Sequence, residues 1–280
     1  MNHAMAPKKM QAKGLTVVKS QQITRDMIRL TVNAPALKDA ELPFTDHYIK
    51  LLFVPDGADY TWPFDLAEIR EKYPRSQQPV KRTYSLRRVD QETGDCDIDF
   101  VIHGDQGIAG PWARTAEPGD TLGFAGPGGG WAPSRDYEHF VLAGDEAAAP
   151  AIGAALDHLP EGTTATAYVE VAERGREMDI PDKEGVELHW IYRDGATPGT
   201  KLSEAVRAAG RPSQKTSWFI HGVAEMIREL RRFLFVEQEV DRADASISGY
   251  WRLGMVEDEW QATKREFVES MEREEKSARP

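Results

Sequence analysis

Cysteines and closely spaced histidines are scarce in this sequence. Cys96 is the only cysteine among 280 residues, so the chain cannot form an internal disulfide bond, and a lone thiol suits a reducing cytoplasm. One cysteine also excludes a cysteine-ligated iron–sulfur cluster and a CxxC thiol relay. The seven histidines form no HxxxH or HxH pair, and no GxSxG motif is present. We therefore expect no metal site and disfavour a hydrolase.

Long apolar runs and an excess of positive charge are missing as well. No apolar run approaches the roughly 20 residues of a transmembrane helix. Residues 1–13 are too polar and basic for a secretion signal, and we interpret them as a frayed terminus. A net charge of −11 argues against nucleic acid or an anionic membrane as the main partner. We expect a cytoplasmic protein with neither partner, long enough for two ordinary domains.

The first half of the chain is rich in short segments that alternate apolar and polar residues, each bounded by Gly, Pro or Asp. These segments are residues 15–19, 27–32, 48–54, 82–88, 97–103 and 120–126. Six such strands predict a closed antiparallel β barrel. Residues 55–79 hold too many prolines and charges for a core, so we expect a surface loop there with a short helix near residues 65–72.

The pattern changes after Gly130 to strands that alternate with helices. Strands are expected at residues 140–143, 166–172, 186–192, 217–221 and 245–250, and helices at residues 147–159, 201–209 and 223–238. This alternation predicts an α/β domain with a parallel sheet. A Gly/Pro/Ser segment at residues 130–136 marks the boundary, which gives domains at 14–132 and 133–280. The charged tail spaces Trp260, Phe267 and Met271 as one stripe of a terminal helix.

One strand of the barrel carries residues that suit a flavin. Arg82 and Tyr84 are two apart and share a face, whereas Ser85 points to the other face or bends back through its hydroxyl. A tyrosine ring stacks on an isoalloxazine, an arginine neutralises phosphate, and a hydroxyl near the flavin N5 tunes the ring. The alternative is an amphipathic strand with a surface arginine.

A small-residue segment follows this strand along the chain. Residues 107–113 place Gly, Ala and Gly before a short helix, with Pro111 expected at the first helical position, so that backbone N–H groups can approach a pyrophosphate. An ordinary turn into a helix is the alternative. His103 precedes this segment and either contacts the flavin or adenine, or simply caps or packs.

Two strand ends in the second half are candidates for a nucleotide crevice. Gly144-Asp145-Glu146 follows the first strand of the parallel sheet, and residues 220–225 end another strand and open a helix. Ligands of open α/β sheets bind at this edge. A GxGxxG fingerprint is absent, so structural loops are the alternative for both segments.

Taken in order, the motifs resemble the siderophore-interacting proteins, flavin-dependent ferric-siderophore reductases related to the vibriobactin-utilisation proteins. The matching segments are residues 47–53, Arg82-Thr83-Tyr84-Ser85, 103–105 through 112–113, 118–120, 126–127, 144–146 with 150–151, and Gly249-Tyr250-Trp251-Arg252. They cover the chain from about Thr16 to Trp260.

The resemblance implies a ferredoxin-reductase-like fold with an N-terminal FAD-binding barrel and a C-terminal NAD(P)H-binding domain. It also implies a role for each matching residue. The residues expected to contact FAD are Arg82, Thr83, Tyr84, Ser85, His103, Asp105, Ala109, Gly110 and Trp112. Those expected at the nicotinamide crevice are Asp145, Glu146, Ala147 and Glu225.

The sequence departs from the family pattern at two positions. Leu253 stands where the family usually has a second arginine after Tyr-Trp-Arg, which thins the positive charge expected around a ferric siderophore. Ala224 replaces a glycine before Glu225 and leaves the nicotinamide preference open. Candidates for attracting an anionic chelate are Lys50 and Arg252, whereas Arg114 is more simply a solvated charge.

We therefore expect an enzyme that passes electrons from NAD(P)H through FAD to a ferric siderophore and releases Fe(II) in the cytoplasm, as a monomer. One alternative is another flavin reductase of the same fold with a different acceptor. A second is a ferric-siderophore-binding protein without activity. The siderophore and the choice between NADH and NADPH stay open, although Arg174 or Arg176 could meet a 2′-phosphate if they are not simply solvated.

Overall fold

The computed structural model describes residues 11–102, 104–105 and 107–278. The chain divides into two compact units. The first takes in most residues up to Gly129, and the second takes in Gly130 onward with the short segments Ile23–Met27 and Pro43–Asp46. The domain boundary between residues 132 and 133 stays a prediction.

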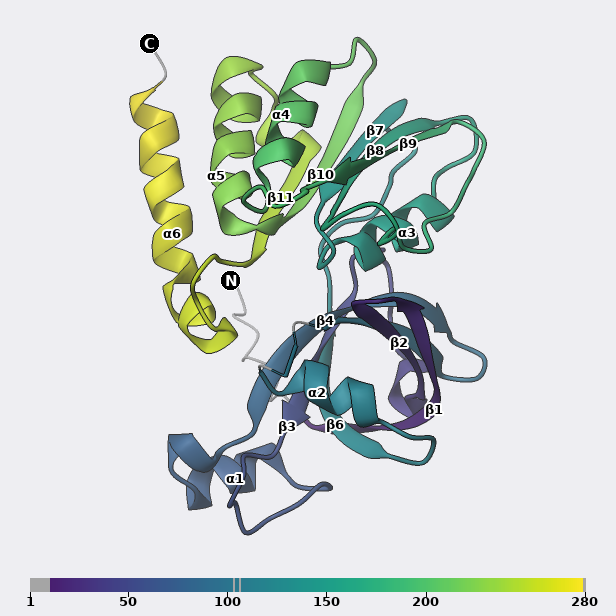
Figure 1. Cartoon of the computed structure of the whole chain (residues 1–280), viewed down its shortest axis with the longest axis vertical. Helices are drawn as coiled ribbons and strands as arrows, with labels where there is room; N and C mark the ends of the chain where they lie inside the picture. Colours follow the sequence, from purple (N-terminus) through teal and green to yellow (C-terminus); the bar gives the residue numbers. More distant parts are fainter. Residues whose placement is uncertain (1–10, 103, 106, 279–280) are drawn as a thin grey trace, which may run out of the picture. The chain divides into compact units, whose positions relative to one another are not determined.

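The first unit is a closed barrel of six antiparallel strands in the order β1-β2-β5-β4-β3-β6 (Figure 1). The strands are β1 (Lys13–Thr24), β2 (Met27–Asn33), β3 (Tyr48–Phe53), β4 (Val80–Asp90), β5 (Asp95–Val101) and β6 (Thr121–Gly128). The predicted barrel is confirmed. Alternation along β3 sends Ile49, Leu51 and Phe53 into the barrel core, so Lys50 faces outward.

Two helical elements lie within the loop predicted at residues 55–79. Helix α1 (Leu66–Lys72) is confirmed, and the Asp65 carboxylate caps it by accepting from the Ala67 N–H at 2.6 Å. A 3₁₀ helix, η2 (Arg75–Gln77), follows. Trp62 anchors this insert on the barrel, because a Cβ added at Gly123 of β6 would lie only 2.6 Å from its ring. The insert therefore docks on the outer surface of the barrel.

The second unit holds a parallel sheet with strand order β11-β10-β7-β8-β9. Its strands are β7 (His139–Gly144), β8 (Thr164–Val171), β9 (Val186–Tyr192), β10 (Thr216–Val223) and β11 (Ala245–Trp251). Its helices are α3 (Ala149–Asp157), α4 (Thr200–Ala209), α5 (Ala224–Arg232), which continues into the π-helical η3 (Phe233–Glu237), and α6 (Glu257–Ser277). Helix α3 covers one face of the sheet, and α4 and α5 cover the other (Figure 1). The predicted α/β architecture is confirmed.

Helix α6 forms as the spacing of its large residues predicts, and Trp260, Phe267 and Met271 are buried. Trp260 lies against Gly249 of β11, where an added Cβ would be 2.9 Å from the indole. None of the helices in the described part of the chain is long and apolar enough to cross a membrane.

Candidate functional site

Strand β4 presents the aromatic and cationic residues expected to meet a flavin. Arg82 lies opposite Leu51 and Tyr84 lies opposite Ile49, so the two do share one face. The partly exposed Tyr84 ring packs on Phe100, with ring centroids 4.3 Å apart. Thr83 is exposed and Ser85 is buried, both on the opposite face of the strand.

Helix α2 (Ala109–Thr115) packs on β3 and β5, the two strands that flank β4, through its tryptophan. The Trp112 ring packs against Phe53 and Phe100, with centroid distances of 5.6 and 5.9 Å. The helix begins at Ala109, and among the described residues no side chain caps its first N–H groups. Pro111 is therefore the third helical residue, not the first as predicted. Proline is tolerated there because N–H groups of a first helical turn have no partner within the helix.

An ion pair connects α2 to the loop before it. The Arg114 guanidinium donates to the Asp105 carboxylate at 2.6 Å and to the Gly104 carbonyl at 2.9 Å. Both side chains are exposed, as expected of a solvated charge at Arg114. His103, predicted to lie near the flavin, is outside the described residues.

The Asp145 carboxylate joins three strand ends of the second unit. It accepts hydrogen bonds from the Ala147 and Val223 N–H groups at 3.0 and 2.8 Å and from the Trp251 indole N–H at 2.8 Å. Gly222, at φ +140°, makes room for it, since an added Cβ would lie 2.8 Å from a carboxylate oxygen. Burial raises the pKa of Asp145 to about 7, and the nearby charges of Glu146 and Glu170 act in the same direction.

Asp145 is fully buried, and its hydrogen bonds hold the ends of β7, β10 and β11 together. Its contact with a nicotinamide stays a prediction. The Trp251 indole that completes this contact was part of a matching segment, but nothing in the sequence indicated its partner.

Glu146, the next predicted residue, is tied to an arginine that the sequence did not single out. Arg193 donates two hydrogen bonds of 2.7 Å to the Glu146 carboxylate and a third of 3.3 Å to Glu170. Glu170 is fully buried and also accepts from the Gly199 N–H at 2.8 Å, at the start of α4. Burial raises the pKa of Glu170, although these donors oppose the rise.

Glu225 and Arg252, predicted for cofactor and substrate respectively, lie together. The Arg252 Nε is 3.4 Å from a Glu225 carboxylate oxygen, and the guanidinium lies over the Phe267 ring at 5.0 Å. The Leu253 N–H also donates to Glu225, at 3.4 Å. The positive charge of Arg252 is therefore partly neutralised within the unit.

The two arginines considered for a 2′-phosphate are engaged near the end of β8. The Arg174 guanidinium lies 4.9 Å from the Tyr192 ring centroid. Arg176 pairs with Glu173 at 2.9 Å. Arg176 also pairs with Asp26 at 2.6 Å, and its side chain is largely buried, whereas Arg174 is an exposed charge.

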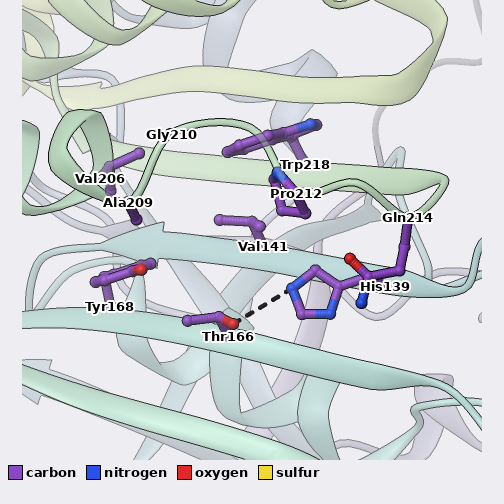
Figure 2. Close-up of a pocket in the computed structure, with 10 residues that line it drawn as sticks. All are labelled: His139, Val141, Thr166, Tyr168, Val206, Ala209, Gly210, Pro212, Gln214 and Trp218. Carbon is purple, nitrogen blue, oxygen red and sulfur yellow. Dashed lines mark hydrogen bonds between the residues drawn. The ribbon is translucent and has the colours of Figure 1, made fainter.

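A cavity of about 240 Å³ lies in the second unit, at the edge where the strands of the sheet begin (Figure 2). Its polar side includes His139, whose Nε2 is 3.3 Å from the Thr166 hydroxyl, and its apolar side includes Trp218. Burial lowers the pKa of His139. Asp145, Glu146 and Glu225 follow strand ends, so this cavity is not part of the predicted nucleotide crevice.

The groups on β4 and α2 fit a flavin nucleotide. A partly exposed tyrosine ring backed by Phe100 supplies stacking, and Arg82 with the exposed Thr83 supplies a cation and a hydroxyl on the same strand. The uncapped start of α2 supplies N–H groups for a phosphate. These are the kinds of group that a flavin and its pyrophosphate require.

Solved structures define the class of this fold. The crystal structure of a siderophore utilization protein from T. fusca is 30% identical, with a TM-score of 0.75, over 89% of this chain and 95% of that one. The ferredoxin-NADP+ reductase of Plasmodium falciparum is 10% identical, with a TM-score of 0.64, over 85% and 96% of the two chains. The fold is therefore ferredoxin-reductase-like.

Sequence families then identify the chain more closely. Residues 16–131 match the siderophore-interacting FAD-binding domain, and residues 137–254 match the siderophore-interacting protein family. The chain belongs to the siderophore-interacting protein family, as its motifs predicted. The FAD-binding match and the fold together support FAD as the cofactor.

Three relatives extend over most of the chain. An uncharacterised protein of Mycobacterium tuberculosis, Rv2895c, is 36% identical over 91% of this chain and 95% of its own. The ferric vibriobactin reductase ViuB of Vibrio cholerae is 27% identical over 87% and 90%. The NADPH-dependent ferric-chelate reductase of Escherichia coli is 26% identical over 85% and 91%.

Proposed function

We propose that the protein is a cytoplasmic, flavin-dependent reductase that takes electrons from NAD(P)H and delivers them to a ferric siderophore. The observation that carries this proposal is the β4 strand, where Arg82 and the Phe100-backed Tyr84 share one face within a siderophore-interacting FAD-binding domain. The names of ViuB and of the Escherichia coli relative support the reaction, and the latter supports NADPH as donor.

In this proposal the barrel holds FAD with the residues predicted from the sequence. Arg82 neutralises phosphate or flavin charge, Tyr84 stacks on the ring, and Thr83 and Ser85 supply hydroxyls. Ala109 and Gly110 offer backbone N–H groups to the pyrophosphate, while Trp112 fixes α2 against Phe100. The chemistry that FAD supplies when bound is the conversion of a two-electron hydride donor into single-electron delivery.

The second unit supplies the nicotinamide crevice at the carboxyl edge of its sheet. Glu146, Ala147 and Glu225 line it, and Asp145 holds the strand ends that position them. Hydride transfer and electron transfer to iron need no protein acid or base, so these residues bind and orient. Lys50 and Arg252 attract the anionic chelate, with Arg252 weakened by Glu225.

Reduction of the chelate frees the iron because iron(II) binds hard oxygen ligands more weakly than iron(III). One electron enters the ferric ion, and the ferrous ion leaves the siderophore oxygens. Two ferric chelates are therefore reduced for each NAD(P)H oxidised.

The test is an anaerobic absorbance experiment on FAD-loaded protein. We expect flavin bands near roughly 380 and 450 nm that bleach with NADPH or NADH and return when ferric siderophore is added, while a ferrous-specific indicator develops colour. Bands that bleach but ignore ferric chelates would indicate a different acceptor on the same fold. Protein that cannot be loaded with FAD, yet binds ferric siderophore, would indicate a carrier.

Two variants connect this test to the predicted flavin site. Arg82→Ala should weaken FAD binding by about tenfold or more, the usual effect of losing a charge-assisted hydrogen bond. Arg88→Ala is the matched control, because Arg88 is an exposed arginine on the same strand. Equal affinities in both variants would remove Arg82 from the proposed site.

A further inference from the structure

The cavity of the second unit lies where helix α4 ends over the sheet (Figure 2). Helix α4 ends at Ala209, and Gly210 turns the chain out of the helix with a φ of +72°. The chain then runs through Pro212 and Gln214 to the start of β10. A loop, rather than a helix, therefore lies over the first residues of the strands, and a space of about 240 Å³ is left beneath it.

Three neighbouring strands form the floor of this cavity. Val141 of β7 lies opposite both Thr166 of β8 and Trp218 of β10, so the three side chains share one face of the sheet. Tyr168 adds a second aromatic ring on the same face, and stacking on His189, with ring centroids 4.9 Å apart, holds this ring in place. Two aromatic rings beside a valine give an apolar surface that suits a planar ring.

The polar corner of the cavity is neutral. His139 is 8% exposed, and its Nδ1 lies 2.7 Å from the Thr164 hydroxyl, whereas its Nε2 lies 3.3 Å from the Thr166 hydroxyl. Burial lowers the pKa of His139, so the imidazole is uncharged at pH 7. A hydroxyl has two acceptor lone pairs and one proton, so Thr166 can contact the imidazole and still accept from a ligand.

The described residues that line the cavity include no Asp, Glu, Lys or Arg. A charged ligand would therefore be buried there without a counter-charge, which is unfavourable. Ala209 and Gln214 at the rim are exposed, so a ligand can enter between the end of α4 and the loop. An apolar cavity of about 150 Å³ can hold a benzene ring. The larger volume of this cavity has room for a ring with a polar substituent or with a second fused ring.

We infer that this cavity is a binding site for a small neutral aromatic molecule with one N–H or O–H donor, of the size of phenol or indole. The ring lies against Tyr168 and Trp218, and the donor points to the Thr166 hydroxyl. The site is separate from the nucleotide crevice, because Asp145 follows the opposite end of the six-residue strand β7, roughly 20 Å away. The inference does not depend on the proposed reductase function.

The test is calorimetric titration of indole into FAD-loaded protein, with and without saturating NADP+. Ala209→Leu places a larger side chain at the mouth of the cavity, and it should fold because Ala209 is exposed. Ala208→Leu is the matched control, since Ala208 is an exposed neighbour on the same helix and does not line the cavity. Thr166→Val removes the hydroxyl and keeps the shape of the side chain.

We expect indole to bind at one site with a Kd of about 1 mM or lower, and NADP+ should leave this Kd unchanged. Ala209→Leu should raise the Kd by about tenfold or more, whereas Ala208→Leu should leave it unchanged. Thr166→Val should raise it by about threefold to tenfold, the usual effect of losing one neutral hydrogen bond. Benzoate, a ring with a negative charge, should bind at least about tenfold more weakly than indole.

Three results would overturn the site. The first is no saturable binding up to about 5 mM indole. The second is the same Kd in Ala209→Leu and Ala208→Leu, which would place the indole elsewhere. The third is competition with NADP+, which would assign the indole to the nucleotide crevice. None of these results bears on whether the protein reduces ferric siderophores.

Discussion

Asp145 shows how one side chain can organise the edge of a sheet. Its carboxylate accepts hydrogen bonds from two backbone N–H groups and an indole N–H. Hydrogen bonds favour its charged form, but complete burial and the charges of Glu146 and Glu170 outweigh them. The result is a carboxyl group whose pKa, about 7, lies well above its ordinary value of 3.8.

We predict that Asp145→Asn changes the pH dependence of stability. Native Asp145 keeps its proton up to about pH 7, whereas the unfolded chain releases it near pH 4, so the native state binds more protons between these values. The free energy of unfolding contributed by this group is therefore largest below pH 4 and falls as pH rises to 7. Asn does not titrate and removes this slope.

The measurement is urea unfolding of native and variant protein from pH 4 to pH 8. The difference in unfolding free energy should shrink toward pH 7 by an amount on the order of a few kcal/mol. Asp39→Asn, at an exposed aspartate, is the control. Parallel pH profiles for the native protein and Asp145→Asn would contradict the raised pKa.

Residue roles differ in how far the sequence predicts them. The shared face of Arg82 and Tyr84 follows from strand periodicity, which is local, and the register confirms it. Two of the three hydrogen-bond partners of Asp145 are 78 and 106 positions away, and no local pattern connects them to it. The role of Arg193 was not predicted for the same reason. Its position after a strand does not indicate that it contacts two glutamates.

At the scale of elements, helix α6 combines an apolar stripe with one buried ion-pair cluster. Glu275 near its end is buried, and its carboxylate accepts from Arg231 of α5 at 2.7 Å and also from Arg242. Burial opposes ionisation of Glu275, but the hydrogen bonds and charges of the two arginines prevail and hold its pKa below the ordinary value.

We predict that Glu275→Gln destabilises the second unit by about 3 kcal/mol at pH 7, because Arg231 is left buried without a counter-charge. A lowered carboxylate pKa stabilises the native state above its ordinary pKa of 4.5 and loses this effect as pH falls through the native value. The difference in unfolding free energy between the native protein and the variant should therefore become smaller below pH 4.5.

Chemical unfolding at pH 7 and at acidic pH measures both effects. Glu274→Gln is the matched control, since the neighbouring Glu274 is exposed and pairs with Arg228 on the surface. Exposed pairs contribute about 0–1 kcal/mol. Equal losses in the two variants would contradict the special role of Glu275.

Elements were easier to predict than the way they dock. The alternation of apolar and polar residues predicted the barrel strands, and the helical spacing of large apolar residues predicted α6. The sequence did not indicate that the insert docks on the barrel. Trp62 packs where Gly123 lacks a side chain, and a glycine adds nothing to a hydrophobic pattern. The start of α2 was misplaced by two residues because proline fits the first helical turn at more than one position.

At the scale of the whole molecule, the two units are expected to bind different cofactors. We predict that FAD slows amide hydrogen exchange in the barrel, chiefly in β4 and α2, and that NADP+ slows exchange after β7 and β10 in the second unit. A ligand protects the segments it contacts, and it stabilises the folded state by about 2.7 kcal/mol at 100 times its dissociation constant.

Hydrogen exchange with mass spectrometry on the intact protein resolves these segments. FAD protection confined to the second unit, or NADP+ protection confined to the barrel, would contradict the assignment of the cofactors. ATP, which lacks both redox rings, is the control ligand for general nucleotide binding.

The barrel closes by pairing its first strand with its last, Lys13 of β1 with Phe124 of β6. During synthesis at roughly 5–20 residues per second, β1 leaves the ribosome on the order of ten seconds before β6. For that time both open edges of the nascent sheet have unpaired backbone groups that can recruit other chains. The yield of folded protein should therefore depend on translation speed and chaperone supply up to residue 128, where β6 ends.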